Sequence, residues 1–576
     1  MAEKDIAESP VETKEEEIKK TEPGEPGKEE GTKELRQIPL HKLDMKRLIE
    51  LDACTRCGEC LSWCPVYDQD SKEDLIPRRK IIDFLRLARS QSGFLAGIVK
   101  SDNVPKALKK ALKKVTGYQE ITQEQIDDFV FNLYECSTCG QCEIVCPAHI
   151  DTVNLWEELR RIIVRAGYGP LEPQKALRKS VKTFDNPWQQ PRAGRTKWSR
   201  RAKKDGLIET EPREIKKTGG KVLLFFGCTA SYDANVKQVA INTINILEAL
   251  DIDYGVLGKH EKCCGSVLLR MGDPEYKRLF QENIEQFNSL GIDTLISSCS
   301  GCFKTIMQDY PKVAPINFEV LHTVEYLARL LKQGKLDFPH PVNRTITYHD
   351  PCHLGRATGG FDAPRMIMDA IPGLKLVEMP RNREYSRCCG AGGGLKAGFP
   401  DIQGRMAQRR VKEAEETGAT DLVSCCPFCY QGLQVGIGVS ESPIIMRDMS
   451  YYVAHSLLGY DVFEKAAGEA EEKKRLKEEK KRLKQEEKAK KKAEKEKARE
   501  EKDGKEKEEK KDEEESTSAD KDSEKEKRKA EKKLEKEKRR AQKKLEKEKK
   551  AAEKLKKAEE KKKEQPDKEV PDPEEK

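Results

Sequence analysis

One five-cysteine pattern occurs twice in the sequence. In each copy a single cysteine, a Cys-Cys-Gly motif and a Cys-x-x-Cys motif follow one another with spacers of 34 to 36 residues. The first set is Cys228, Cys263, Cys264, Cys299 and Cys302, and the second set is Cys352, Cys388, Cys389, Cys426 and Cys429. Because the spacers match, we expect strands and helices of equal size to bring the same five thiols together twice. Cys425 is an extra cysteine, since Ser298 stands at its position in the first copy.

Five thiolates exceed what a four-iron cubane needs, so each set predicts an iron–sulfur centre of unusual shape. Soft thiolate ligands suit iron, and such an iron is a suitable place for the sulfur of a thiol or disulfide substrate. The glycines in "RCCGAGGG" leave room for a bulky cluster or an approaching ligand. A vicinal disulfide would not explain three further cysteines in register, and "GAGGG" lacks the spacing of a dinucleotide loop. Zinc in one of the two sets remains open.

Two further runs, "CTRCGECLSWCP" and "CSTCGQCEIVCP", have the spacing of bacterial two-cluster ferredoxins. In that spacing three cysteines bind one cubane and the fourth binds the other. Gly58 and Gly140 would let backbone amides approach the cluster sulfurs. Structural zinc also needs four ligands, but the doubled spacing with proline favours iron–sulfur clusters that act as electron carriers. We expect one [4Fe–4S] cluster on Cys54, Cys57, Cys60 and Cys146, and another on Cys136, Cys139, Cys142 and Cys64.

The segments around these cysteines predict the fold class. Helical segments such as "RRKIIDFLRLARS" separate the ferredoxin runs, whereas each five-cysteine copy has strands that end at cysteines, such as "KVLLFFGC" and "TDLVSCCPFC". Alternating strands and helices favour a parallel α/β layer, and ligands bind at the carboxyl ends of such strands. We therefore predict a helical two-cluster domain, then two duplicated α/β Cys-Cys-Gly domains, then a charged tail. The expected boundaries are 1–36 for a disordered N-terminus, 37–184 for the helical ferredoxin-like domain, 185–218 for a linker, 219–340 and 341–463 for the two Cys-Cys-Gly domains, and 464–576 for a Lys/Glu-rich low-complexity tail that is disordered or helical.

Charge is unevenly distributed along the chain. Residues 471–576 hold 44 Lys and Arg against 36 Asp and Glu, which accounts for the whole net charge of +8. The remainder is neutral, which argues against a nucleic-acid-binding core. The N-terminus is acidic without an apolar signal region, and no apolar run is long enough to span a bilayer. Nineteen cysteines in such a chain predict metal or redox chemistry in the cytoplasm rather than disulfides.

Taken together, the motifs resemble the D subunit of membrane-bound heterodisulfide reductase and the Hdr-like menaquinol oxidoreductase subunits of sulfate-respiring anaerobes. The resemblance covers about residues 40–460 and rests on "LDACTRCGECLSWCP", "FFGCTASY", "CCGSVLLRMG", "CSGCFK", "TYHDPCHLGR" and "RCCGAGGGLKAG". The acidic N-terminus, the long tail and the insert "SQSGFLAGIVKSDNVPKALKKALKKVTG" depart from the shorter family pattern.

The resemblance implies two cubanes that feed one or two non-cubane [4Fe–4S] clusters, with one such cluster on the first set and one on the second. It implies a membrane b-type cytochrome partner that handles menaquinol or methanophenazine, and further Hdr-like subunits. The acceptor would be a disulfide or thiol, either a small molecule or a protein, that reacts at the five-cysteine centres. The protein would then lie on the cytoplasmic face of the membrane through its membrane partner.

Reducing a disulfide to two thiols also takes two protons. His349 and His353 flank Cys352, so either is a candidate proton donor near neutral pH. A histidine at a strand end more often only hydrogen-bonds its loop, and this structural interpretation stays open.

Four functions account for these motifs to different degrees. The first is an electron-transfer and catalytic subunit of an Hdr-like, quinol-linked oxidoreductase, and the second is the CoB–CoM heterodisulfide reductase D subunit proper. The third is the iron–sulfur subunit of a glycolate or lactate dehydrogenase, in which the Cys-Cys-Gly domains would conduct electrons from a flavin partner. The fourth is a zinc-stabilised scaffold, which the ferredoxin spacing disfavours.

Overall fold

The computed structural model describes residues 38, 42–91, 94–116, 118–513, 529, 532–536 and 538. The expected disordered N-terminus, 1–36, lies outside these residues. The chain divides into two compact units, Met1–Glu472 and Lys473–Lys576. Among the described helices, none combines the length and apolar character needed to cross a bilayer.

The first part of the larger unit is helical. Its elements are α1 Met45–Asp52, α2 Cys60–Trp63, α3 Tyr67–Asp70, η2 Glu73–Leu75, α4 Pro77–Gln91, α5 Phe94–Lys100, α6 Lys106–Thr116, α7 Gln123–Tyr134, α8 Gln141–Ile144, α9 Thr152–Arg165 and α10 Glu172–Phe184. Helix α7 begins at a capping box, in which the Thr122 hydroxyl accepts from the Gln125 amide and the Gln125 side chain accepts from the Thr122 amide. The two cysteine-rich loops lie at α2 and α8, which contact each other. Helical packing therefore brings together two loops that are about 80 residues apart in the sequence.

Two parallel four-stranded sheets follow, with the same strand order. The first runs β2-β1-β3-β4 and the second β6-β5-β7-β8. The strands are β1 Val222–Leu224, β2 Tyr254–Gly255, β3 Thr294–Ser297, β4 Glu319–His322, β5 Arg344–His349, β6 Leu374–Leu376, β7 Asp421–Ser424 and β8 Ile445–Asp448. Strands β1 and β7 are buried on both faces, as parallel strands covered by helices usually are. The predicted duplicated α/β fold is confirmed.

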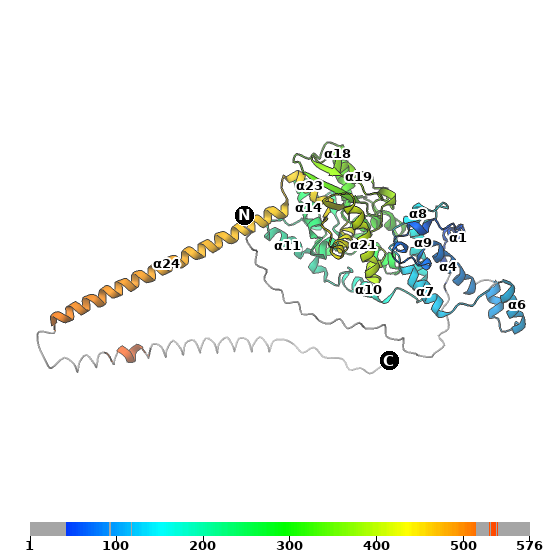
Figure 1. Ribbon diagram of the computed structural model, residues 1–576, viewed down its shortest axis with the longest axis horizontal. Helices are drawn as coiled ribbons and strands as arrows, with labels where there is room; N and C mark the ends of the chain where they lie inside the picture. The colour runs from blue at the N-terminus through cyan, green and yellow to red at the C-terminus, as the bar shows by residue number, and fades with distance from the viewer. Residues whose placement is uncertain are drawn as a thin grey trace. The chain divides into compact units, whose positions relative to one another are not determined.

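Short helices connect the strands in both sheets. In the first domain they are α13 Gly227–Tyr232, α14 Lys237–Ala249, η4 Gly258–His260, α15 Ser266–Met271, α16 Tyr276–Asn288, α17 Ser300–Lys304, η5 Thr305–Asp309, η6 Tyr310–Lys312 and α18 Thr323–Lys332. In the second they are α19 Asp362–Ala370, η7 Arg383–Tyr385, α20 Leu395–Gly398, α21 Pro400–Glu415, α22 Pro427–Ser440 and α23 Met449–Leu458. One hydrophobic core joins the two sheets, since Leu223 and Phe225 belong to the same cluster as Tyr348 and Val423. Figure 1 shows the two domains as one body beside the helical region.

Residues 185–218 are more than the polar linker that we expected. They form η3 Arg192–Thr196, α11 Lys197–Lys204 and α12 Ile215–Thr218. Trp198 is buried and meets the ring of Phe226 edge-on, with 5.2 Å between the ring centroids. The segment therefore packs as part of the first Cys-Cys-Gly domain, because its apolar residues fall on one side of α11 beneath a charged face.

The charged tail begins as one long helix, α24 Val462–Glu513. Val462 and Ala466 are buried at its start. From Lys473 to residue 502 every side chain is exposed, and i,i+4 ion pairs such as Arg482–Glu486 support the helix. This agrees with a solvated helical segment, and most of the tail beyond 513 lies outside the described residues.

Candidate functional site

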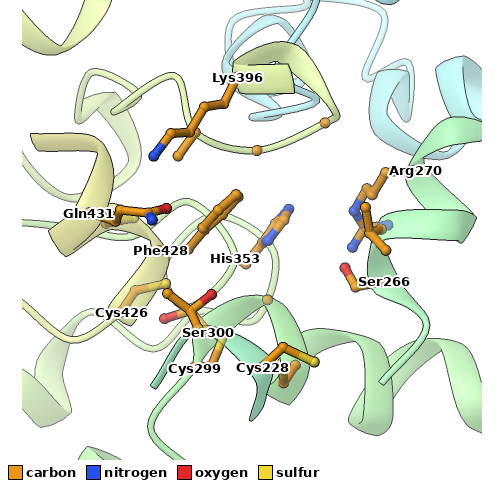
Figure 2. Close-up of a pocket in the computed structure, with 18 of the residues that line it drawn as sticks. Cys228, Ser266, Arg270, Cys299, Ser300, His353, Lys396, Cys426, Phe428 and Gln431 are labelled. Carbon is orange, nitrogen blue, oxygen red and sulfur yellow. The ribbon is translucent and has the colours of Figure 1, made fainter. Parts of the chain in front are cut away.

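All ten cysteines of the two sets line a single cavity. The cavity has a volume of about 430 Å³ and opens at the carboxyl ends of the strands in both sheets. Figure 2 shows Gln431 of the second domain and Arg270 of the first on opposite sides of it, with Cys426 beside Cys299 at its edge. The cysteines in its wall are Cys228, Cys263, Cys264, Cys299, Cys302, Cys352, Cys388, Cys389, Cys426 and Cys429. The duplication therefore builds one shared site from two sets.

The same local geometry presents the cysteines in both domains. Cys299 and Cys426 each cap a helix that directly follows a central strand. Each Cys-Cys-Gly motif ends at a glycine with positive φ, +81° at Gly265 and +77° at Gly390. The amide of that glycine donates to the Sγ of the first cysteine of its motif, at 3.4 Å in the first domain and 3.3 Å in the second. Such a backbone turn aims N–H groups at sulfur, a contact that tunes iron–sulfur centres.

The thiols of the two sets form one chain of contacts. Cys389 Sγ lies 3.4 Å from Cys429 Sγ, and Cys429 packs with Cys426. Cys426 in turn packs with Cys299 of the first set, so the chain crosses from one domain to the other. Hydrogen bonds from Cys388 and Cys429 lower the pKa of Cys389 well below that of an ordinary thiol.

The donor set fits an iron–sulfur centre. Among the described residues every cysteine is free of a disulfide, although several sulfurs are in contact. Packed free thiols with N–H···S bonds are what a thiolate-ligated cluster needs, and thiolate is the ligand that iron–sulfur clusters select.

Charged side chains also reach the cavity. Arg270 lines it and pairs with Glu157 through Nη1, and its Nη2 lies 3.9 Å from Asp309 Oδ2. Its Nε has no hydrogen-bond partner among the described residues. His353 lines the same wall, and its buried Nε2 is also without a partner there. Burial, then the nearby charges of Arg270 and Lys304, lower the pKa of His353 to about 3. Figure 2 shows Arg270 and His353 facing the same space, which can therefore bind an electron-rich group.

His349 is placed differently from His353. Its ring lies within 4.8 Å of the sulfurs of Cys389 and Cys429 but is not part of the cavity wall. Arg410 Nε donates to His349 Nδ1 at 3.2 Å, which leaves the ring proton on Nε2. The His349 side chain hydrogen-bonds Cys389 and contributes to the lowered pKa of that thiol.

The eight ferredoxin cysteines line two smaller cavities. One is lined by Cys54, Cys57, Cys60 and Cys146, and the other by Cys64, Cys136 and Cys139, with Cys142 in the wall of both. The structure thus brings the cysteines together in the two groups expected from their spacing. Burial raises the pKa of the Cys64 thiol to about 11.

The second of these cavities adjoins the ten-cysteine cavity. The thiols of Cys139 and Cys388 pack together, and Cys388 Sγ lies 3.4 Å from Ser137 Oγ. A Cβ placed on Gly393 would lie 2.5 Å from the carbonyl carbon of Ser137. The glycines of "GAGGG" were expected to leave room for a cluster or ligand. They line the cavity, and Gly393 additionally lets the ferredoxin loop approach.

Three arginines at these junctions were not predicted from the sequence. Arg195 donates to Cys228 Sγ at 3.1 Å and pairs with buried Glu261 at 2.6 Å. Arg356 donates to the carbonyl of Cys139 at 2.8 Å, and Arg160 donates to the carbonyls of Cys136 and Gly393. Arg356 ends the quoted stretch "TYHDPCHLGR" but was assigned no role, and Arg195 lies in the segment expected to be a linker.

Comparison with known proteins agrees with this geometry. The family described as the 4Fe-4S dicluster domain matches residues 50–150, and the Cysteine-rich domain family matches residues 222–307 and 346–434. The chain is 38% identical over 428 residues to the D subunit of the dihydromethanophenazine:CoB--CoM heterodisulfide reductase of Methanosarcina barkeri, covering 73% of this chain and 97% of that protein. The chain belongs to the family of the heterodisulfide reductase D subunit. This confirms the resemblance expected from the motifs.

Two further relatives of the chain are redox proteins by their names. The chain is 32% identical to the probable iron-sulfur-binding oxidoreductase FadF of Bacillus subtilis, over 72% of this chain and 61% of that protein. It is 29% identical to the EtfAB:quinone oxidoreductase of Syntrophomonas wolfei, over 69% and 56%. The protein is therefore an iron–sulfur oxidoreductase subunit.

Proposed function

We propose that the protein carries electrons between a membrane b-type cytochrome that handles a quinol and a disulfide-type acceptor. The observation that carries this proposal is the shared cavity, in which both five-cysteine sets face one space next to the second ferredoxin cavity. When bound, non-cubane iron–sulfur clusters would supply the electrons and the iron that takes up sulfur. We propose that the first set of five cysteines binds one non-cubane cluster and the second set binds another. The two ferredoxin groups are the proposed ligands of the two cubanes.

The sulfur contacts define an order of sites. Cys57 of the first ferredoxin group is exposed, whereas Cys139 of the second group contacts Cys388 of the second set. The second set contacts the first through Cys426 and Cys299. We therefore place the exchange with the membrane partner at the first cubane, and the acceptor at the cavity between the two sets.

The cavity residues fit a sulfur acceptor. Cleaving a disulfide to two thiols consumes two electrons and two protons, and negative charge develops on the departing sulfur. The Nε of Arg270 and the Nε2 of His353 line this cavity without a hydrogen-bond partner among the described residues, so both side chains can hold that sulfur by hydrogen bonds. Because its pKa is lowered to about 3, His353 is neutral near pH 7, so its proposed role is to hydrogen-bond the departing sulfur and not to store a proton for it. His349, with its proton at Nε2 beside Cys389, is the candidate proton donor.

One acceptor has a specific observation in its favour. The Methanosarcina barkeri relative acts on the CoB--CoM heterodisulfide by its name, and it aligns over 97% of its length with this chain. CoB--CoM heterodisulfide is therefore the first acceptor to test, followed by other disulfides, because this chain carries extensions beyond the aligned 73%.

A dye-linked assay tests the proposed reaction. We expect the anaerobic protein to oxidise reduced viologen when a disulfide acceptor is added. His353→Gln should lose about a hundred-fold in kcat with unchanged iron content, because it removes a donor to the departing sulfur. His260→Gln is the control, since His260 is exposed and is not part of the cavity wall. Absence of turnover with every disulfide tried, in protein with full iron content, would contradict the proposal.

A further inference from the structure

The insert that departs from the family pattern forms two helices, α5 and α6. Helix α6 buries none of its side chains, and Phe94, Leu108 and Val115 are 82%, 51% and 85% exposed. Figure 1 shows α6 at the end of the helical region, away from the two sheets. These side chains therefore contribute nothing to the core of the described unit. Their exposure on the surface requires another explanation.

Helix α6 divides into two faces of opposite character. At 100° per residue its apolar residues all fall on one side and its lysines all fall on the other. The apolar face consists of Ala107, Leu108, Ala111, Leu112 and Val115, and the polar face of Lys106, Lys109, Lys110, Lys113 and Lys114. A helix with this pattern normally buries its apolar face against a surface that tolerates the charged face beside it.

The charge of the insert points to the chemistry of that surface. Residues 94–116 contain six lysines and one acidic residue, Asp102. Of the five lysines in α6, only Lys113 has an ion pair among the described residues, with Glu120 at 2.8 Å. The remaining positive charge is left for an anionic partner.

We propose that α6, together with Phe94, lies in the headgroup layer of an anionic lipid bilayer. An anionic bilayer offers apolar chains to the Leu108 and Val115 face, and phosphate groups to lysines that extend outward. The polar face repeats a single type of side chain, without the Trp, Tyr or Arg anchors of specific protein interfaces. Diffuse negative charge therefore suits it better than a shaped acidic partner.

This attachment would orient the part of the protein that exchanges electrons with the membrane partner. The consequence rests on the proposed function. Helix α4 precedes α5 and contacts it, and its first residues, Pro77, Arg78 and Ile81, line the first ferredoxin cavity. The 15 residues of α4 span about 22 Å from this cavity to the end of the helix that precedes α5. Docking through α6 therefore links the first cubane site to the lipid surface through α4 and α5.

Vesicle flotation with hydrogen exchange of the full-length protein tests the inference. The vesicles are phosphatidylcholine with or without about 30% phosphatidylglycerol, at about 0.15 M salt. We expect flotation with the anionic vesicles only, and slower exchange of the amides in Lys106–Thr116. The double variant Leu108→Gln/Val115→Gln should lower the floated fraction about fivefold, since it removes the buried apolar contact. Lys110→Gln/Lys114→Gln should lower the floated fraction and make that fraction less sensitive to the salt concentration.

A matched control separates this effect from a general loss of apolar surface. Val435→Gln/Val439→Gln changes two valines of α22, of which Val439 is 61% exposed, and should float as the unchanged protein does. Equal binding to neutral vesicles, or protection confined to the lysine-rich tail, would overturn the proposal. Protection of α6 by partner subunits but not by vesicles would show a protein interface and also overturn it. The test needs no electron donor or disulfide, so its failure is distinct from failure of the proposed reaction.

Discussion

Cys389→Ser should abolish reduction of the acceptor and remove about four iron atoms per chain. Cys389 lies at the centre of the second set, where its sulfur contacts Cys388, Cys429 and His349. Serine offers a harder oxygen ligand in place of thiolate, and iron–sulfur clusters select thiolate. The cubane signals should persist, because the ferredoxin cysteines line separate cavities. Iron analysis, EPR spectroscopy and the viologen assay on one preparation measure all three outcomes.

Cys425→Ser is the matched control. Cys425 is also buried and is adjacent to Cys426 in the chain, but its thiol interacts with Tyr348 and it is not part of the cavity wall. Its replacement should leave iron content and turnover close to those of the unchanged protein. Equal iron loss in both variants would show that the effect is on folding, and full activity in Cys389→Ser would contradict the assigned site.

Arg160→Leu should lower the free energy of unfolding by about 3–5 kcal/mol, the range for breaking a buried polar network. The Arg160 side chain is fully buried and donates to carbonyls from three parts of the chain: Leu133 and Cys136, Arg270, and Gly393. Leucine would leave these carbonyls without partners in a dry interior. Since Arg160 joins the ferredoxin loop to both Cys-Cys-Gly domains, electron transfer to the acceptor should fall as well. Urea unfolding, followed by the visible absorbance of the clusters, measures the change.

The neighbouring Arg161 provides the comparison. Its guanidinium pairs with Glu158 and donates to the hydroxyl of Tyr276, and its side chain is 20% exposed. Arg161→Leu should therefore cost about 1–2 kcal/mol, less than Arg160→Leu. Similar unfolding midpoints for the two variants would contradict the role of Arg160 in joining the domains.

The sequence predicted those parts of the site that depend on local spacing. Matched spacers placed Cys299 and Cys426 at equivalent strand ends, because a parallel α/β repeat of constant length returns to the same edge of its sheet. The ferredoxin spacing likewise predicted which cysteines would group together, although the ligand sets stay predictions.

Features that depend on packing between segments could not be predicted. The contact of Cys299 with Cys426 requires two domains to face each other, which no spacing within either domain specifies. Arg195 reaches Cys228 from a segment with no cysteine motif, and its polar composition suggested a linker. Whether a lone arginine such as Arg160 is exposed or buried depends on distant carbonyls, which the pattern of its own helix does not reveal.

The central claim is that sulfur of the acceptor binds where the two five-cysteine sets meet. The most direct measurement is EPR of the anaerobically purified, oxidised protein with and without an added thiol. Four four-iron clusters would give about 16 iron atoms per chain. The account predicts that thiol produces a new paramagnetic signal, and that this signal is absent from Cys389→Ser and present in Cys425→Ser. A spectrum that thiol leaves unchanged at full iron content, or about 8 iron atoms with stoichiometric zinc, would contradict it.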